Sequence, residues 1–448
     1  MSKDVKTIKL DAIIESLNSG AMLKAKLILN GLHPAEIARL LESSPSRQRR
    51  LIWEMLDHSN DGEVLLEVGE EVRNNLMESM DESSLLAATK GLDVDDLADL
   101  LDELPDTVVT QALQGMDYQY RTRLESVMNY AEDTAGGLMN IDTITIRPDV
   151  TLDVVLKYLR LRKEMPRNTD NIIVVDRYNH YLGTLPVTSL VCSDPEKIVS
   201  ESMNKNYVSI NADALAGDVV NIFEDRDLVS APVIDKNNIL LGRITIDDVV
   251  DVIREESEST VLNMAGLTDE EDIFAPIISS TRRRAIWLGL NLVTALIASG
   301  VISLFQDTIE QVVALAVLMP IVASMGGIAG SQTLTLVIRG IALGNISSAN
   351  SKSLLIKEVT VGILNSLLWA SVIGVLSSYW FNNYLIGVVI GIAMIANLAF
   401  AALSGVLIPI LLKKAGVDPA LGGTVILTTI TDVIGFFSFL ALGTIFLL

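Results

Sequence analysis

Hydrophobic and polar positions follow three different patterns along this 448-residue chain. As far as residue 130, apolar residues recur at helical spacing in short segments separated by turn residues, which predicts a set of small amphipathic helices. Between residues 139 and 253, strand-like and helical segments alternate, which predicts β-α-β units. Beyond residue 284 the chain is almost continuously apolar, and this pattern is typical of a membrane domain.

The apolar region divides into spans of about 20 residues each. The long segments without ionisable side chains, Asp432 excepted, are 285–306, 311–338, 359–412 and 420–448. The third segment is too long for one crossing, so we expect two helices there with a break near Phe381–Tyr384. Five crossings result, and an odd number places the two termini on opposite sides of the membrane.

Basic residues decide the predicted orientation. Arg282–Arg284, the segment from Arg339 to Lys357, and Lys413–Lys414 all fall on one side, whereas the opposite loops contain no Lys or Arg. By the positive-inside rule, that side is the cytoplasm. The N-terminal region, which lacks the apolar core of a signal peptide, is therefore expected in the cytoplasm, and Leu448 near the outer face.

Asp432 is the only ionisable side chain in the last 29 residues. Placing a carboxylate in the bilayer costs about 2.5 to 3.5 kcal/mol on insertion scales, so such residues usually face a water-filled cavity or a partner. We therefore predict that Asp432 marks a cation path. A protonated carboxyl group hydrogen-bonded to a neighbouring helix is the alternative.

Small and helix-breaking residues recur within the spans. They let helices approach closely and free backbone carbonyl groups to face a cavity, which is useful in a channel or transporter. A tighter helix bundle without a pathway explains the same residues. The predicted pore-lining residues are Pro320, Gly326, Gly327, Asn397 and Gly435.

Charge is divided unequally between the two halves of the chain. Residues 285–448 contain five basic and five acidic residues, which leaves 29 basic and 51 acidic residues in the first 284 and accounts for the net charge of −22. This acidity argues against nucleic acid as a partner and in favour of cations. No phosphate-binding G-x-x-x-x-G-K-[ST] loop occurs, so we expect passive transport and no enzymatic activity. The single cysteine, Cys192, permits no intrachain disulfide and fits a reducing cytoplasm.

Two internal repeats organise the cytoplasmic half. Residues 33–45 align with residues 93–105, which predicts a helical repeat. Asp95 and Asp99 of the second copy lie four residues apart, on one helical face. A cation that neutralises them and an ordinary solvated acidic face are both compatible with that spacing.

The second repeat, in residues 139–253, resembles the tandem cystathionine-β-synthase (CBS) regulatory module. Residues 146–159 align with 210–223, and each half predicts strand, helix, strand, turn, strand, helix. Members of that family often contact adenosine nucleotides through G-x-x-T-x-x-D, which Gly242–Asp248 matches, whereas Gly183–Ser189 lacks the Asp. Thr245 and Asp248 are therefore candidates for binding ATP or another adenosine nucleotide; a purely structural β-α pair is the alternative.

Acidic residues continue from this module into the segment before the first span. Asp248, Asp251 and Glu255 are spaced three and four residues apart and share one helical face. Hard oxygen ligands at this density suit Mg²⁺ or Ca²⁺, and the three scattered histidines with one cysteine offer no zinc site.

The order of these parts resembles the MgtE family of bacterial magnesium channels over essentially the whole chain. The motifs that carry the resemblance are Ala131–Met139, the Pro320–Gln332 stretch with Arg339-Gly340, Asp418-Pro419-Ala420 and Thr431–Gly435. The family implies a multidomain membrane protein with an acidic α-helical superhelical N-domain (1–138), an α/β tandem CBS module (139–253), a connecting or plug helix (254–281) and a five-helix transmembrane domain (282–448).

The resemblance also implies a mechanism. Two subunits form a homodimer in the bacterial inner membrane, and Asp432 of each holds a largely hydrated Mg²⁺ in a pore on the two-fold axis. Cytosolic Mg²⁺ bridges acidic residues of the N-domain, the CBS module and the connecting helix, and so closes the pore. The implied sensing residues are Asp95, Asp99, Asp213, Asp227, Asp248, Asp251 and Glu256, with Glu255 and Glu258 beside them. Many family members have Gly-Gly-Asn where this chain has Gly326-Gly327-Ile328, so selectivity or conductance is expected to differ.

These features predict a passive, voltage-driven Mg²⁺ channel for uptake, which also admits other divalent ions such as Co²⁺ or Mn²⁺. The lipid bilayer is its second partner. One alternative is a membrane-anchored adenosine-nucleotide sensor whose spans serve only as a tether. Another is a proton-coupled transporter in which Asp432 carries the proton.

Overall fold

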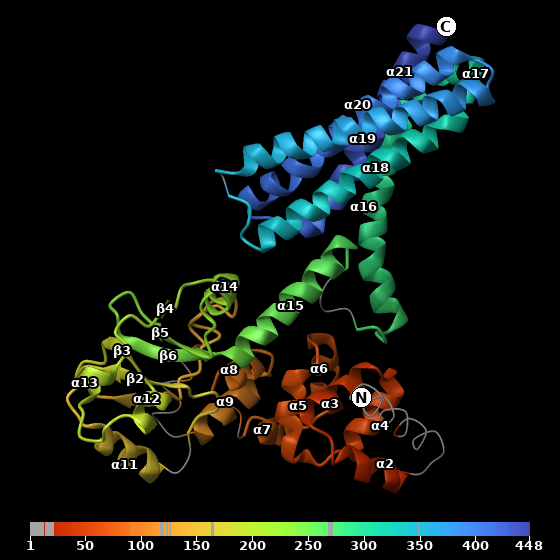
Figure 1. Ribbon diagram of the computed structural model, residues 1–448. Coiled ribbons are helices and arrows are strands. Elements are labelled where there is room, and N and C mark those ends of the chain that lie inside the picture. Colours follow the sequence, from red (N-terminus) through yellow and green to blue (C-terminus); the bar gives the residue numbers. More distant parts are fainter. Residues whose placement is uncertain are drawn as a thin grey trace. The chain divides into compact units, whose positions relative to one another are not determined.

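Two compact units make up the computed structural model of the chain (Figure 1). It describes residues 22–90, 94–116, 127–162, 165–267, 272–347 and 349–448, together with Ile13, Leu92, Arg121 and Leu124. The first unit comprises Met1–Ser257 with Glu270–Ala275, and the second comprises Glu258–Asp269 with Pro276–Leu448. The first unit contains the predicted helical repeats and tandem module, and the second contains the membrane helices.

The N-domain consists of short helices, as predicted. They are α2 (Met22–Leu29), α3 (Pro34–Glu42), α4 (Ser46–Met55), the 3₁₀ turn η1 (His58–Asn60), α5 (Asp61–Glu67), α6 (Glu70–Met77), α7 (Glu82–Ala88), α8 (Val94–Asp102) and α9 (Asp106–Gly115). The repeat is visible in their lengths, since α3 and α8 each have 9 residues and α4 and α9 each have 10. Pro45 and Pro105 occupy the N-cap positions of α4 and α9, where a missing N–H costs nothing.

The two halves of the α/β module repeat the predicted order of elements. The first half contains β1 (Thr145–Ile146), α11 (Leu152–Arg162), β2 (Asn171–Val175), β3 (Tyr181–Pro186) and α12 (Val187–Cys192), and the short α13 (Val199–Ser202) follows. The second contains β4 (Ile210–Asn211), α14 (Ala216–Arg226), β5 (Ser230–Ile234), β6 (Leu240–Thr245) and α15 (Ile246–Met264). In each sheet the central strand pairs parallel with the short strand and antiparallel with the third.

The N-domain and the second half of the module share one hydrophobic core. That core runs from Leu40 and Trp53 through Leu101 to Phe223 and Val249. The segment that joins the two domains pairs with the second half, since Ala135 N donates to Ala214 O at 2.8 Å and Gly136 N to Ala212 O at 2.9 Å. This continuity makes the cytoplasmic region one packed unit.

Among the described residues, the membrane unit contains five long apolar helices, which confirms the predicted number. They are α16 (Ile277–Ser303), α18 (Val313–Ala342), α19 (Ser351–Trp380), α20 (Tyr384–Lys414) and α21 (Pro419–Leu447); the short α17 (Gln306–Gln311) follows α16. The predicted break in the third apolar segment is confirmed, because α19 ends and α20 begins within three residues of Asn382. Helix α20 packs against α18, α19 and α21 and is the most buried of the five (Figure 1).

The connecting segment differs in detail from the expected helix over 254–281. Helix α15 begins earlier, at Ile246 directly after β6, and ends at Met264. Gly266, with φ of +72°, follows it, and Trp287 lies so close that a Cβ on Gly266 would fall 3.0 Å from the indole ring. The chain then turns into α16, which begins at Ile277, eight residues before the expected start of the first span at residue 285.

Candidate ion pathway and regulatory site

Asp432 lies in the middle of α21 and is half buried within its own chain. Its carboxylate makes no hydrogen bond or ion pair with the part of the chain that the structure describes. The alternative in which a neighbouring helix of the same subunit holds a protonated Asp432 therefore has no partner group among these residues. An unpaired carboxylate at membrane depth is a group that a passing cation or its hydration water can contact.

Asn397 of α20 forms a polar contact beside Gly435, which lies three residues beyond Asp432 on α21. Its side chain is fully buried and donates from Nδ2 to Val322 O of α18 at 2.8 Å. A Cβ on Gly326 would lie 2.3 Å from Asn397 Nδ2, and a Cβ on Gly435 would lie 2.7 Å from it. These two glycines thus leave room for the amide between α18 and α21. Asn397 Oδ1 is buried and has no hydrogen-bond partner in the described structure.

The other predicted pore-lining residues are more accessible within one subunit. Pro320 lies inside α18 and is exposed. Gly327 is partly exposed, and nothing lies within 4 Å of the position a Cβ would take. Ile328 is 55% exposed. The structure thus separates Gly326 and Gly435, which pack against Asn397, from Pro320 and Gly327, which do not.

Thr245 and Asp248 bond to each other where β6 passes into α15. Asp248 Oδ2 accepts hydrogen bonds of 3.0 Å from both Thr245 N and Thr245 Oγ1, and Thr245 Oγ1 also contacts the carboxylate of Asp247. This arrangement caps the first turn of α15. Both candidate nucleotide contacts therefore have a structural role already, and nucleotide binding by them stays a prediction.

Burial raises the pKa of Asp248 to about 6, and the neighbouring charges of Asp247 and Asp251 raise it further, against the lowering effect of the Thr245 hydrogen bonds. The charged form is disfavoured because the carboxylate has lost water and faces like charges. A bound divalent cation would reverse both effects. Hard carboxylate oxygens at this position fit Mg²⁺ as a ligand.

The other predicted sensing residues lie mostly on the surface. Asp99 is exposed on α8, and Asp95 belongs to the same helix, but its side chain lies outside the described residues. Asp213 is 2.7 Å from Lys236 Nζ, and Asp227 takes a left-handed conformation at the C-cap of α14. On α15, Asp251 pairs loosely with Arg254 at 3.8 Å; Glu255, Glu256 and Glu258 are also exposed.

No three of these carboxylates come together as a metal site within the described residues. Glu256 approaches α14, since its Oε1 lies 3.0 Å from the position of a Cβ on Gly217. The predicted sensing residues are thus distributed over α8, α15 and the two ends of α14.

The C-terminal end of α15 packs against the membrane helices of the second unit. Asn263 Nδ2 donates to Asp418 Oδ2 at 3.0 Å, and Asp418 also caps α21 by accepting from Ala420 N at 2.8 Å. Met264 packs against a core that includes Leu334 and Leu427. The sequence offered Asp418-Pro419-Ala420 as a motif but gave no sign of its partner in α15.

Sequence reasoning also missed a contact that the segment between α15 and α16 makes with α4. Asp272 forms a buried ion pair with Arg49 of α4, at 2.7 Å, with side-chain exposures of 3% and 4%. Glu71 accepts from Asp272 N at 3.0 Å, and Ser46 Oγ donates to Phe274 O at 3.4 Å. This segment is therefore part of the first unit, bonded to the N-domain. No local pattern around Arg49 distinguishes it from Arg50.

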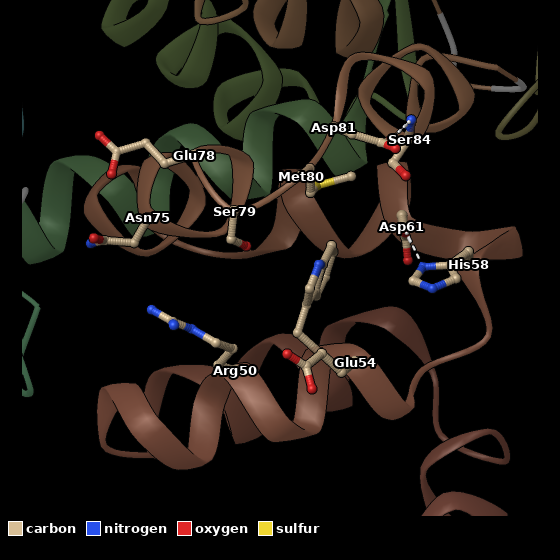
Figure 2. Close-up of a pocket in the computed structure, with 11 residues that line it drawn as sticks. Arg50, Glu54, His58, Asp61, Asn75, Glu78, Ser79, Met80, Asp81 and Ser84 are labelled. Carbon is tan, nitrogen blue, oxygen red and sulfur yellow. Dashed lines mark hydrogen bonds and ion pairs between the residues drawn. The ribbon is translucent and has the colours of Figure 1, made fainter.

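The N-domain also contains a pocket of about 740 Å³, bordered by α4, α5 and the end of α6 (Figure 2). His58 Nδ1 lies 2.8 Å from the buried Asp61, while Arg50, Glu54 and Glu78 stand around the opening. None of the predicted sensing residues lines it.

Together, a helical acidic domain, a tandem α/β module and five apolar helices define a multi-pass membrane protein with a large N-terminal region. Three family models match the chain: MgtE, the divalent cation transporter, over residues 319–442; the MgtE intracellular N domain over 32–133; and the CBS domain over 198–255.

Individual relatives cover nearly the whole chain. The magnesium transporter MgtE of Thermus thermophilus is 29% identical over 439 residues, which are 97% of this chain and 97% of that protein. The magnesium transporter MgtE of Bacillus subtilis is 27% identical over 435 residues, 97% of this chain and 96% of that protein. Over nearly its whole length the chain is therefore similar to members of the MgtE family.

Among solved structures, the cytosolic domain of the Mg²⁺ channel MgtE in complex with ATP is 28% identical, with a TM-score of 0.49. It covers 54% of this chain, and the match spans 99% of that structure. The soluble part of a magnesium transporter is 22% identical with a TM-score of 0.47, and covers 56% of this chain and 99% of its own.

Proposed function

We propose that this protein is a passive Mg²⁺ channel for uptake across the bacterial inner membrane, and that Asp432 contacts the ion. The observation that carries the proposal is the carboxylate of Asp432, which is half buried in α21 and has no partner in the described part of its own chain. The buried Asn397 of α20, which packs against Gly435 three residues beyond Asp432 on α21, also has an Oδ1 without a partner in the described structure. Two relatives that cover nearly the whole chain are magnesium transporters.

The proposed site holds Mg²⁺ as a hydrated ion. Mg²⁺ gives up its water reluctantly, so a carboxylate that bonds the water shell suits it better than a closed cage of ligands. In a homodimer, two copies of Asp432 would supply two negative charges for one divalent ion. Co²⁺ and Mn²⁺, which share the charge and oxygen ligands, would compete.

The membrane potential is sufficient to drive such uptake. A divalent cation gains about 4.6 kcal/mol on entering a cell with 100 mV inside negative. The acidic cytoplasmic region, with 51 acidic residues among the first 284, would lie on the side where the ion arrives. This orientation follows from the basic residues of the loops and is part of the proposal.

Closure by cytosolic Mg²⁺ would act through α15. The helix is continuous from Ile246 to Met264, begins in the first unit and ends in the second, where Asn263 bonds Asp418 at the start of α21. Mg²⁺ that bridges the carboxylates of α8, α14 and α15 would fix the position of this helix. Without the ion, their mutual repulsion would release it.

The function is tested by growth of a bacterial strain that lacks its own Mg²⁺ uptake systems, on medium low in Mg²⁺. The wild-type protein should restore growth, and Asp432→Asn should not, although it reaches the membrane in equal amount. Asp307→Asn is the matched control, because it makes the same change at an exposed carboxylate of α17 to which no role in the ion path or its closure is assigned. Failure of the wild-type protein to restore growth would instead favour the nucleotide sensor.

A further inference from the structure

A pocket of about 530 Å³ lies between the C-terminal end of α18 and the first turns of α19. Its walls are largely apolar, with Leu336, Leu343 and Leu354 among them. Two basic side chains, Arg339 and Lys357, also line it. No predicted pore or sensing residue belongs to it, so the proposed channel function leaves it unexplained.

The local sequence builds this pocket through one tight turn. Gly344, with φ of +65°, ends α18, and Ile346 folds back so that a Cβ on Gly340 would lie 2.7 Å from its Cδ1. Asn350 holds the loop, since its Nδ2 donates to Asn345 O at 2.7 Å and its Oδ1 accepts from Ser347 N at 2.9 Å. The Arg339-Gly340 pair therefore combines a cation with the close approach that shapes the wall beside it.

Of the two basic side chains in the pocket, one has a neighbouring carboxylate and the other has none in the described part of the chain. Lys357 Nζ lies 3.2 Å from the carboxylate of Glu358, which partly neutralises it. Arg339 makes no side-chain hydrogen bond or ion pair within the described residues. A guanidinium beside apolar walls, with its donors unused, suits an anion that carries an apolar part.

The pocket lies where two spans reach the membrane surface, since the apolar helices end at Ala342 and begin again at Ser351. Leu336 and Leu343 are 46% and 53% exposed beside Arg339, so apolar surface continues along α18 from the basic group. A phospholipid has the same order of parts, a charged headgroup followed by acyl chains. Anionic headgroups are recognised by basic pockets between helices on the cytoplasmic side.

We propose that this pocket binds an anionic phospholipid of the cytoplasmic leaflet, with its phosphate between Arg339 and Lys357 and an acyl chain along Leu336 and Leu343. The leaflet rests on the orientation proposed above, whereas the binding itself does not depend on ion transport. The planar guanidinium can donate two hydrogen bonds to one phosphate. Such a lipid would tie the α18–α19 turn to the membrane surface.

Native mass spectrometry of the full-length protein tests this proposal. Protein released from micelles that contain phosphatidylglycerol should retain this lipid, and should retain much less phosphatidylcholine. Arg339→Gln and Lys357→Gln should each lower phosphatidylglycerol affinity about five-fold, which corresponds to about 1 kcal/mol for each basic group. The double variant Lys413→Gln/Lys414→Gln, which removes two basic residues from the end of α20, should retain the lipid like the wild type.

Leu336→Gln/Leu343→Gln provides a second, charge-neutral test of the acyl-chain contact, with folding checked by gel filtration. It should also weaken retention. Equal retention by Arg339→Gln and wild type, or equal retention of the two lipids by wild type, would overturn the proposal. Displacement of the lipid by inorganic phosphate alone would indicate a site for a free anion and would also overturn the proposal. The same holds if Arg339→Gln loses the dimer but retains the lipid.

Discussion

Asn397 Nδ2 donates a hydrogen bond to Val322 O across the interface between α20 and α18, at 2.8 Å. The amide fits there because Gly326 and Gly435 have no side chains, and it joins α18, α20 and α21 close to Asp432. A single polar contact thereby fixes the helices around the residue to which we assign ion contact.

Gly435→Ala is expected to destabilise the membrane domain. The added methyl group would lie 2.7 Å from Asn397 Nδ2, and over-packing of this kind costs about 1 to 3 kcal/mol. The melting temperature of the purified protein in detergent should fall. Gly327→Ala should leave it nearly unchanged, since nothing lies within 4 Å of the corresponding position.

A double variant tests whether Asn397 is the cause of this loss of stability. If Asn397 is the obstacle, adding Asn397→Ala to Gly435→Ala should cost less than the sum of the two single changes, because the smaller side chain makes room. Strict additivity of the two changes would show that the glycine is needed for another reason.

The buried pair of Arg49 and Asp272 predicts a specific proteolysis result. Arg49→Met leaves the Asp272 carboxylate buried without its partner, which costs about 3 to 5 kcal/mol, so the 272–275 segment should leave the N-domain. Chymotrypsin should then cleave after Phe274 faster than in the wild type.

Arg50→Met is the control for that experiment. Arg50 is the next residue on α4, but it is exposed and lines the pocket of Figure 2 instead of reaching Asp272. Unchanged cleavage after Phe274 in Arg49→Met would show that the ion pair does not hold the segment.

The raised pKa of Asp248 predicts how stability changes with pH. The Asp248 carboxyl group stays protonated up to about pH 6 in the folded protein, but only up to about pH 4 in the unfolded chain. Its contribution to the free energy of unfolding is therefore complete below about pH 4 and is lost as pH rises through about 6. Between pH 5 and 8 the loss is about 1 kcal/mol.

Asp248→Asn should remove that loss. In metal-free buffer the variant should melt above the wild type at pH 8, with a smaller difference at pH 5, because the amide keeps an oxygen for Thr245 and carries no charge. Added Mg²⁺ should stabilise the wild type more than the variant. A constant difference in melting temperature across this pH range would contradict the assignment.

Much of the architecture was predictable because it depends on local patterns. The five apolar helices, the break beside Asn382, and the repeated order of strands and helices each follow from composition and periodicity within a few dozen residues. The helix after β6 was expected from that repeated order, whereas its end at Met264 was not, because residues 254–281 were assigned to one connecting helix.

The rest depends on contacts that sequence periodicity does not encode. Arg49 and Asp272 are 223 residues apart, and either one alone resembles an ordinary surface charge. Asn397 is recognisable as polar within a span, but its bond to Val322 O depends on how α18 and α20 cross. The sensing carboxylates were implied by the resemblance to a family, and the described structure does not assemble three of them.

Mg²⁺ influx into liposomes that contain the purified protein tests the central claim most directly. Under an inside-negative potential, with an indicator enclosed, the wild type and the control Asp307→Asn should admit Mg²⁺. Asp432→Asn should admit it more slowly by more than about tenfold, since one unit of negative charge is lost at a site of low dielectric constant. Equal influx through Asp432→Asn and the wild type would contradict the assignment of the ion path to Asp432.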